Sequence, residues 1–189
     1  MKHPSSQAFF AYWDKQRDGA AAPDRSAIEP DALRSLLGDM FVVSCDAPGY
    51  PFRFAGTRLN ALLGRELKGE KLTNQFMLEQ RRSIEQVLDI VSGDTVAVVA
   101  GILATAPNAT PVTLELLLLP FAQRPHTPLS ATGLLTPLAT RVIGPLTSLR
   151  LTSWRTVGQQ PRRFPPRKLR KFQVIRGLTV YEGSRGDSA

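Results

Sequence analysis

One carboxylate stands in the most apolar stretch of the chain. Glu115 interrupts a run of leucines in LELLLLPF, residues 114–121, which has the composition of a buried strand. A carboxylate turned into a protein interior needs a partner, because burying an unpaired charge is costly. Arg53 and Arg58 are candidate partners, and we expect the three side chains to line a cavity that binds a polar ligand. The alternative is that Glu115 faces outward at the edge of a sheet.

The other residue types that carry chemistry do not combine into a site. His3 stands close to the N-terminus and His126 stands in a loop with two prolines, and neither forms a visible nucleophile–base pair. The single cysteine, Cys45, cannot form an internal disulfide, and with two histidines it gives no zinc-binding spacing. We therefore expect a non-catalytic protein without a bound metal, in a reducing, cytoplasmic compartment. The sequence does not identify a cofactor.

Basic side chains gather at the C-terminal end of the chain. The formal net charge is +8, and residues 150–189 hold ten of the 24 Lys and Arg against two of the 16 acidic residues. The first 149 residues therefore carry 14 charges of each sign and are neutral overall. Six basic residues lie among prolines in QQPRRFPPRKLRK: Arg162, Arg163, Arg167, Lys168, Arg170 and Lys171.

This basic segment is a candidate site for a polyanion. Lys and Arg suit nucleic-acid phosphates, because they release the bound counterions, and they also suit an anionic membrane surface. Arg163 and Arg167, with three residues between them, resemble the arginine pair of cyclic-dinucleotide-binding PilZ domains, although the rest of that motif is missing. The alternative is a solvated basic linker, followed by a strand in FQVIRGLTVYEG.

Hydrophobic periodicity divides the rest of the chain into helices and strands. We expect helices over residues 7–17, 30–37, 57–63 and 78–91. The expected strands cover residues 40–46, 52–55, 95–105, 112–121 and 130–138. This order predicts an α+β fold in which helices cover one face of a five-stranded antiparallel sheet. No apolar run approaches the ~20 residues of a membrane helix, so we expect no transmembrane segment.

The first helix is strongly aromatic on one face. Phe9, Tyr12 and Trp13 are spaced i, i+3 and i+4, which places them side by side. Such a face either packs on its own domain or joins a second subunit. We take these three residues as the candidate interface of a homodimer.

Several motifs resemble one known family. FFAYWDKQRDG and PDRSAIEPDAL in the first 33 residues, FRFAGTRLNALLGRELKG at 52–69 and LELLLLPF at 114–121 are similar to a PAS-like family common in alphaproteobacteria, often left as a domain of unknown function. The resemblance covers roughly residues 7–140. It implies a PAS fold whose cavity, between sheet and helices, holds haem, flavin, a small acid or nothing at all.

The expected organisation has three parts. Residues 1–29 form an N-terminal aromatic helix and loop, residues 30–140 form the PAS-like domain, and residues 141–189 form a basic C-terminal tail. The resemblance implies a non-catalytic sensory or signalling adaptor that dimerises and acts on an unidentified protein partner. The alternative is a regulator that binds nucleic acid through the basic tail.

Overall fold

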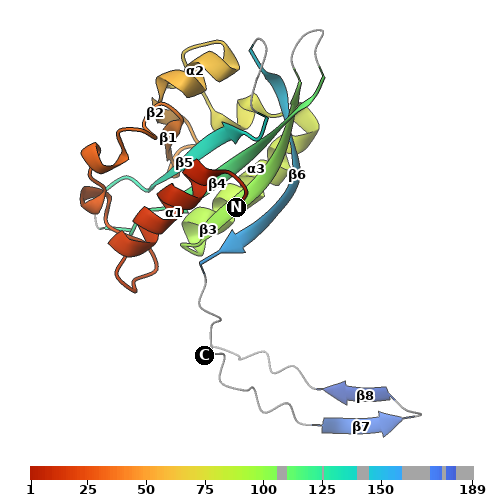
Figure 1. The fold of residues 1–189 in the computed structure, drawn as a ribbon. Helices are drawn as coiled ribbons and strands as arrows, with labels where there is room; N and C mark the ends of the chain where they lie inside the picture. Colours follow the sequence, from red (N-terminus) through yellow and green to blue (C-terminus); the bar gives the residue numbers. More distant parts are fainter. Residues whose placement is uncertain (106–109, 125, 140–144, 159–170, 176–177, 182–189) are drawn as a thin grey trace. The chain divides into compact units, whose positions relative to one another are not determined.

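Six strands form one antiparallel sheet in the order β2-β1-β5-β4-β3-β6 (Figure 1). The structure is a computed structural model that describes residues 1–105, 110–124, 126–139, 145–158, 171–175 and 178–181. The strands are β1 Met40–Ser44, β2 Phe52–Ala55, β3 Ala97–Thr105, β4 Val112–Pro120, β5 Ser130–Pro137 and β6 Thr147–Val157. The α+β architecture with an antiparallel sheet is therefore as the sequence predicts.

The sheet has one strand more than the five expected. The additional strand, β6, pairs with β3 over most of its length and lies in the segment 141–189 that the sequence analysis assigned to the tail. Its sequence TSLRLTSWRTV is mostly exposed, with only Leu149 and Val157 buried. An edge strand with so few apolar positions lacks the alternation of a half-buried strand, and its arginines resemble those of the basic tail.

In the described residues, three α-helices and four short 3₁₀ helices accompany the sheet. They are α1 Pro4–Gln16, α2 Thr57–Leu63, α3 Arg81–Gly93, η1 Arg25–Ala27, η2 Asp31–Leu33, η3 Leu72–Gln75 and η4 Leu78–Gln80. The helix expected over 30–37 is only the short η2. By contrast, α2 has the predicted bounds and ends at Gly64, whose φ of 70° is the left-handed conformation that glycine adopts readily. The apolar face expected for α3 is buried: Ile84, Val87, Leu88 and Val91.

Helices cover both faces of the sheet. The face covered by α2, η3 and α3 is called the inner face here, and the face covered by α1 is called the outer face (Figure 1). Strand β4 serves both, because side chains alternate along a strand. Its Leu114, Leu116 and Leu118 belong to the inner core, whereas Leu117 and Leu119 belong to the outer core. The sequence predicted helices over one face only.

Residues 160–189 form a separate unit. In it, β7 Lys171–Ile175 and β8 Leu178–Tyr181 pair as an antiparallel two-stranded sheet where the sequence predicted a single strand. Arg162, Arg163, Arg167, Lys168 and Arg170 lie outside the described residues, as does the side chain of Lys171. Polyanion binding by this segment therefore stays a prediction. Among the described residues, no helix is long and apolar enough to span a membrane.

Candidate functional site

Side chains almost completely fill the space between the inner face of the sheet and the helices α2 and η3. Phe41 and Phe52 pack edge to face there, with ring centroids 5.7 Å apart, and Leu116 and Phe76 close further sides. The remaining cavity has a volume of about 10 Å³. That is about the space of one water molecule, so this inner cavity holds no small organic molecule with these side chains in place.

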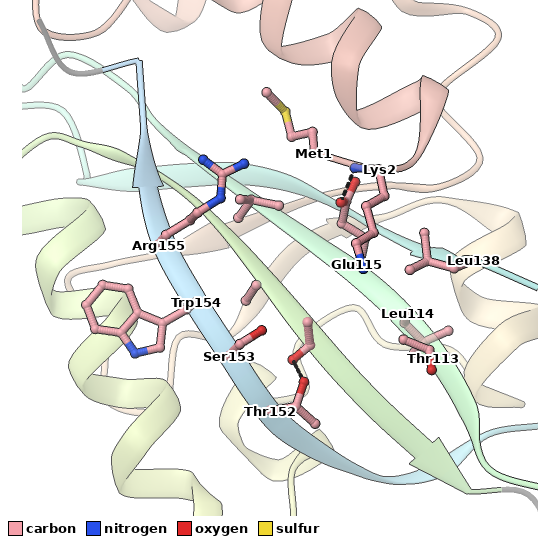
Figure 2. Close-up of a pocket in the computed structure, with 13 residues that line it drawn as sticks. Met1, Lys2, Thr113, Leu114, Glu115, Leu138, Thr152, Ser153, Trp154 and Arg155 are labelled. Carbon is pink, nitrogen blue, oxygen red and sulfur yellow. Dashed lines mark hydrogen bonds between the residues drawn. The ribbon is translucent and has the colours of Figure 1, made fainter.

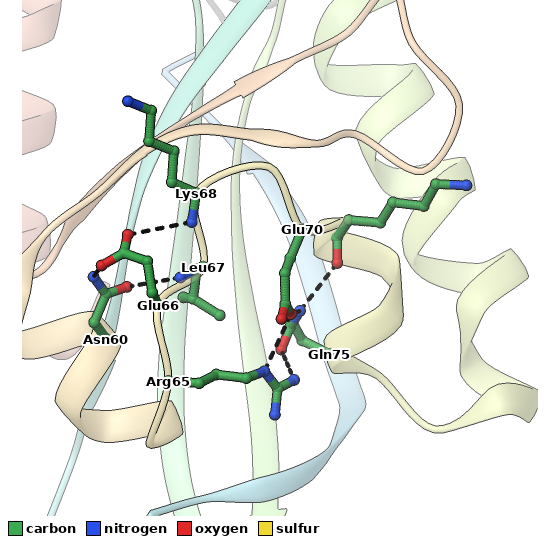
Figure 3. Close-up of polar contacts among 8 residues, drawn as sticks. Asn60, Arg65, Glu66, Leu67, Lys68, Glu70 and Gln75 are labelled. Atoms are coloured by element: carbon green, nitrogen blue, oxygen red, sulfur yellow. Dashed lines mark hydrogen bonds and ion pairs between the residues drawn. The ribbon is translucent and has the colours of Figure 1, made fainter.

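Gln75 is the polar residue in the wall of the inner cavity, and its amide is already engaged (Figure 3). Its Nε2 donates to a carboxylate oxygen of Glu70 and to the carbonyl oxygen of Lys71, both at 3.1 Å, while its Oε1 accepts from the guanidinium of Arg65. Arg65 also donates to Glu70 at 3.1 Å. The Gln75 amide and then the Arg65 guanidinium hold the pKa of Glu70 below its usual value. This network fixes the loop after α2 and leaves no amide N–H free to face a ligand.

A haem or flavin does not fit the inner cavity. Pockets for ligands of that size have volumes of roughly 300–1,000 Å³, far above the space present.

Cys45 lies just beyond β1, and burial is the main cause that raises the pKa of its thiol to about 12. His3 is the N-cap of α1, where its ring nitrogen accepts from the backbone N–H of Ser5. In the part of the chain that the structure describes, no three His, Cys, Asp or Glu side chains are grouped to hold a metal ion.

Glu115 lies on the outer face, where its carboxylate holds the start of α1 (Figure 2). The backbone N–H groups of Lys2 and His3 donate to its two oxygens at 2.6 and 3.0 Å. The residue is 5% exposed. Burial by itself raises the pKa of Glu115, but the backbone donors favour the charged form, and the pKa is lowered overall. Backbone donors thus supply the compensation that the sequence analysis sought in an arginine.

A second bond fastens the other end of α1 to the same strand. The indole Nε1 of Trp13 donates to the carbonyl oxygen of Pro120 at 2.9 Å. Ten residues of helix separate His3 from Trp13, about 15 Å at 1.5 Å per residue. Five residues of β4 separate Glu115 from Pro120, about 17 Å at 3.4 Å per residue. The helix and the strand therefore run side by side with matching lengths between the two attachments.

The same helix contacts the end of β6. Arg17, directly after α1, donates to the carbonyl oxygen of Gly158 at 3.3 Å and lies over the ring of Trp13 at 5.6 Å. The ring of Phe10 lies against Gly158 so closely that a Cβ there would be 2.6 Å from it. Gly158 directly follows β6, the last strand of the main sheet, and the chain continues from it toward the basic segment. The helix α1 and the residue after it therefore contact the C-terminal end of the domain.

A half-open hollow of about 280 Å³ lies beside Glu115 on the outer face (Figure 2). Its floor is formed where Glu115, Gly101 and Ser153 stand opposite one another on β4, β3 and β6. Gly101 has no side chain to fill this space. Lys2 and Arg155 stand at its border, so the hollow combines one carboxylate with cationic side chains.

The structure does not bring the three predicted ligand-binding residues together. Arg53 donates to the hydroxyl of Ser44 at 2.7 Å, and Arg58 forms two hydrogen bonds with Asp39, at 2.9 and 2.7 Å. Neither arginine contacts Glu115, because Arg53 lies on β2 and two strands separate β2 from β4 in the sheet. The expected Arg–Glu pair in the inner cavity is therefore corrected: Glu115 is buried on the opposite face.

The candidate dimer residues pack within their own chain. Phe9 and Trp13 are 0% and 2% exposed and belong to the outer core, against the leucines of β4. The hydroxyl of Tyr12 accepts from the backbone N–H of Glu29 at 3.0 Å. This matches the alternative that the aromatic face covers its own sheet, and it leaves Phe9 and Trp13 no surface for a second subunit in this arrangement.

Sequence reasoning missed the Arg65–Glu70–Gln75 network and the attachment of α1 to β4. Charged residues in a turn have many possible partners, so the sequence does not indicate which of them pair. The donors to Glu115 are backbone N–H groups, which almost every residue carries, so no residue type in the sequence marks them. The one available signal was Trp13, since a buried indole N–H needs an acceptor.

Comparison with known proteins places the chain in a family. Residues 1–136 match a family described as a PAS domain. Similar solved structures include a light-oxygen-voltage domain studied with a flavin analogue, with 12% identity, coverage of 58% of this chain and 84% of that chain, and a TM-score of 0.46. The dark structure of the blue-light photoreceptor Aureochrome1 LOV has 14% identity, coverage of 62% and 86%, and a TM-score of 0.46. The Rhodobacter sphaeroides LOV protein has 18% identity, coverage of 53% and 59%, and a TM-score of 0.42.

The search of curated proteins gave no match. The family match, however, spans α1, the network after α2, α3 and nearly all of the first five strands, so it covers more than half of the chain. The protein therefore belongs to the PAS domain family.

Proposed function

We propose that this protein is a non-catalytic adaptor that acts through contacts with other proteins. Membership of the PAS family implies a sensory or signalling module. The observation that supports an adaptor is the inner cavity of about 10 Å³, which the chain fills with its own side chains. A module whose inner cavity has no room for a ligand receives its signal at the surface. A small ligand would first have to displace Phe41, Phe52 or their neighbours.

The helix α1 is the proposed element that carries the signal. It is attached to β4 by the bonds at Glu115 and Pro120, and it contacts Gly158 at the exit of the domain. A partner that shifts α1 would therefore alter the packing at Gly158. This gives an event at one end of the domain a physical route to the segment that follows β6.

Dimerisation remains part of the proposal, with a different geometry from the one first expected. Because Phe9 and Trp13 are buried in their own chain, a homodimer either leaves α1 in place or exchanges α1 between the two copies. Sedimentation of the purified chain over a range of concentrations distinguishes a dimer from a monomer.

Native mass spectrometry of protein purified without added ligand, combined with an absorption spectrum, tests the adaptor proposal. We expect the mass of the bare chain, as a monomer or a dimer, and no absorption beyond that of the aromatic residues. A co-purifying small molecule in stoichiometric amount would contradict the filled cavity and would make the protein a ligand sensor.

Nucleic-acid binding is the second candidate function, and the charge distribution favours it. The whole net charge of +8 lies in residues 150–189. If the six basic residues of 162–171 contact phosphates, affinity for DNA or RNA should fall about a thousandfold between 50 and 200 mM salt. Replacing the six by glutamine should abolish binding. Indifference of the intact chain to both nucleic acids at low salt would remove this candidate.

A further inference from the structure

One edge of the main sheet offers a strand that another chain can extend. Strand β6 is last in the sheet, and it exceeds the other five strands in length at 11 residues (Figure 1). Along the edge of β6 that faces away from β3, the described residues pair with it only at Leu149. There Phe76 forms a β-bridge with Leu149, and the N–H of Met77 donates to the carbonyl oxygen of Leu149 at 3.0 Å. From Arg150 onward, no described strand covers this edge. Unpaired strand edges bind extended segments through their backbone N–H and C=O groups.

Two hollows flank the same three residues of this edge. The hollow on the outer face, of about 280 Å³, and a second one on the inner face, of about 300 Å³, share Thr152, Ser153 and Trp154. The inner one lies between β6 and α3, where Gln86 forms part of its border. Successive side chains of an added strand point to opposite faces, so they would meet the two hollows in turn.

The pairing of β6 with β3 shows which face each side chain occupies. Arg155 stands on the outer face and Trp154 on the inner face, 44% exposed. The register shifts at Thr152, so Leu151 returns to the inner face and Arg150 to the outer face. A straight antiparallel strand of five residues beside β6 therefore meets Arg155 at its first position and Arg150 at its fifth. It meets Trp154 at the second position and Leu151 at the fourth.

Charge complementarity identifies the occupant. Opposite charges directly across a strand pair stabilise it and like charges destabilise it. The chain has no Asp or Glu from Thr147 to Tyr181, so neither a second copy of β6 nor the C-terminal hairpin supplies an acid opposite these arginines. We propose that the edge of β6 from Arg150 onward, which no described strand covers, binds an extended segment of another protein with the pattern acidic–apolar–any–apolar–acidic. This surface rests on the proposed adaptor function and names where its partner docks.

A capped peptide Thr-Glu-Val-Thr-Val-Glu-Thr, added to the full-length chain at 150 mM salt, probes this surface. Trp154 reports binding, because the other tryptophan, Trp13, is only 2% exposed. We expect a blue shift of tryptophan emission that Trp154→Phe removes. A peptide with Lys in place of both Glu should bind about tenfold more weakly. A peptide with Pro at the central Thr, which cannot donate a backbone hydrogen bond there, should also bind more weakly.

The matching variant reverses the charges on the strand. In Arg150→Glu/Arg155→Glu the preference should invert in favour of the Lys peptide, whereas Arg34→Glu, which changes an exposed arginine at 83% side-chain exposure, should leave it unchanged. Circular dichroism verifies that both variants are folded. An unchanged preference in the double variant overturns the proposal. Equal binding of a peptide of the same composition with adjacent Glu residues also overturns it, since that outcome reports only attraction to the basic segment.

The two proposals fail separately. A bare chain in native mass spectrometry that ignores all the peptides overturns the docking surface and leaves the adaptor proposal standing. A co-purified ligand overturns the adaptor proposal, whereas peptide binding with the stated charge preference still supports the docking surface.

Discussion

Replacing Glu115 by glutamine should release the start of α1 and destabilise the protein. The carboxylate accepts from the backbone N–H groups of Lys2 and His3 at 2.6 and 3.0 Å. A hydrogen bond to a charged group contributes about 1.5–3 kcal/mol. Glutamine keeps one acceptor oxygen but places an NH₂ group against the other donor, so one bond is lost and a donor is left unsatisfied. We expect the free energy of unfolding to fall by about 2–3 kcal/mol.

The pH dependence follows from the lowered pKa of Glu115. Because the folded pKa lies below the ordinary value of 4.5, the carboxylate stabilises the fold fully above that value, and this contribution is lost as the pH falls through the folded pKa. The stability difference between wild type and Glu115→Gln should therefore be constant near neutral pH. It should shrink in acid, below about pH 4.5.

Thermal unfolding, followed by circular dichroism and by tryptophan fluorescence, measures the effect. A loss of 2–3 kcal/mol corresponds to a fall in Tm of about 4–12 °C for a chain of this size. Glu79→Gln is the matched control, because Glu79 is exposed and its replacement should leave Tm unchanged. If Glu115→Gln behaves like the control, or if its deficit persists unchanged at pH 3, the carboxylate does not hold α1 as described.

Three further predictions concern packing and reactivity. Gly133→Ala should destabilise the protein by about 3 kcal/mol in urea unfolding, because its Cβ would lie 2.2 Å from the carbonyl oxygen of Leu117, whereas Gly93→Ala, with open space around it, should be neutral or slightly stabilising. The pKa of Cys45 is raised from 9.0 to about 12, so near neutral pH the folded chain holds about a thousandfold less thiolate than a cysteine with the ordinary pKa. A thiol reagent should therefore label the folded chain far more slowly than the urea-unfolded chain, and equal labelling rates would contradict this. Phe52→Ala should lower the free energy of unfolding by about 3–5 kcal/mol in urea and open the inner cavity, which native mass spectrometry with small apolar molecules can detect.

Periodicity in the sequence located most of the main sheet. Strand β2 has the predicted bounds, β4 and β5 begin where predicted, and all four predicted apolar residues of α3 are buried. Strands β4 and β5 have two covered faces and α3 has a wide apolar stripe, so their sequences record the packing directly, whereas β2 is a short edge strand in which only Phe52 is buried. Strand β6 has one free edge and few apolar residues, and its sequence therefore does not distinguish it from the basic segment that follows.

The candidate site was only partly predictable, for a different reason. The sequence singled out Glu115 as a carboxylate that would need a partner if it were buried, with an outward-facing position as the alternative, and the structure shows that it is buried. It could not order the strands, and strand order determines that two strands lie between Arg53 and Glu115 while the start of α1 lies beside Glu115. The donors that Glu115 meets are backbone groups, which every residue except proline carries, so no residue type announces them.

The match in length between α1 and β4 allows the helix only one register on the sheet. A slip of two residues along the strand, the smallest that keeps Glu115 on the outer face, moves it by about 6.8 Å, which is not a whole number of helical turns of 5.4 Å. The indole of Trp13 and the backbone at His3 cannot both find new acceptors after such a slip. Inserting one residue in α1 would likewise rotate one attachment by about 100° relative to the other. The helix α1 therefore cannot slide along β4, and its detachment from the sheet should be a two-state event rather than a graded one.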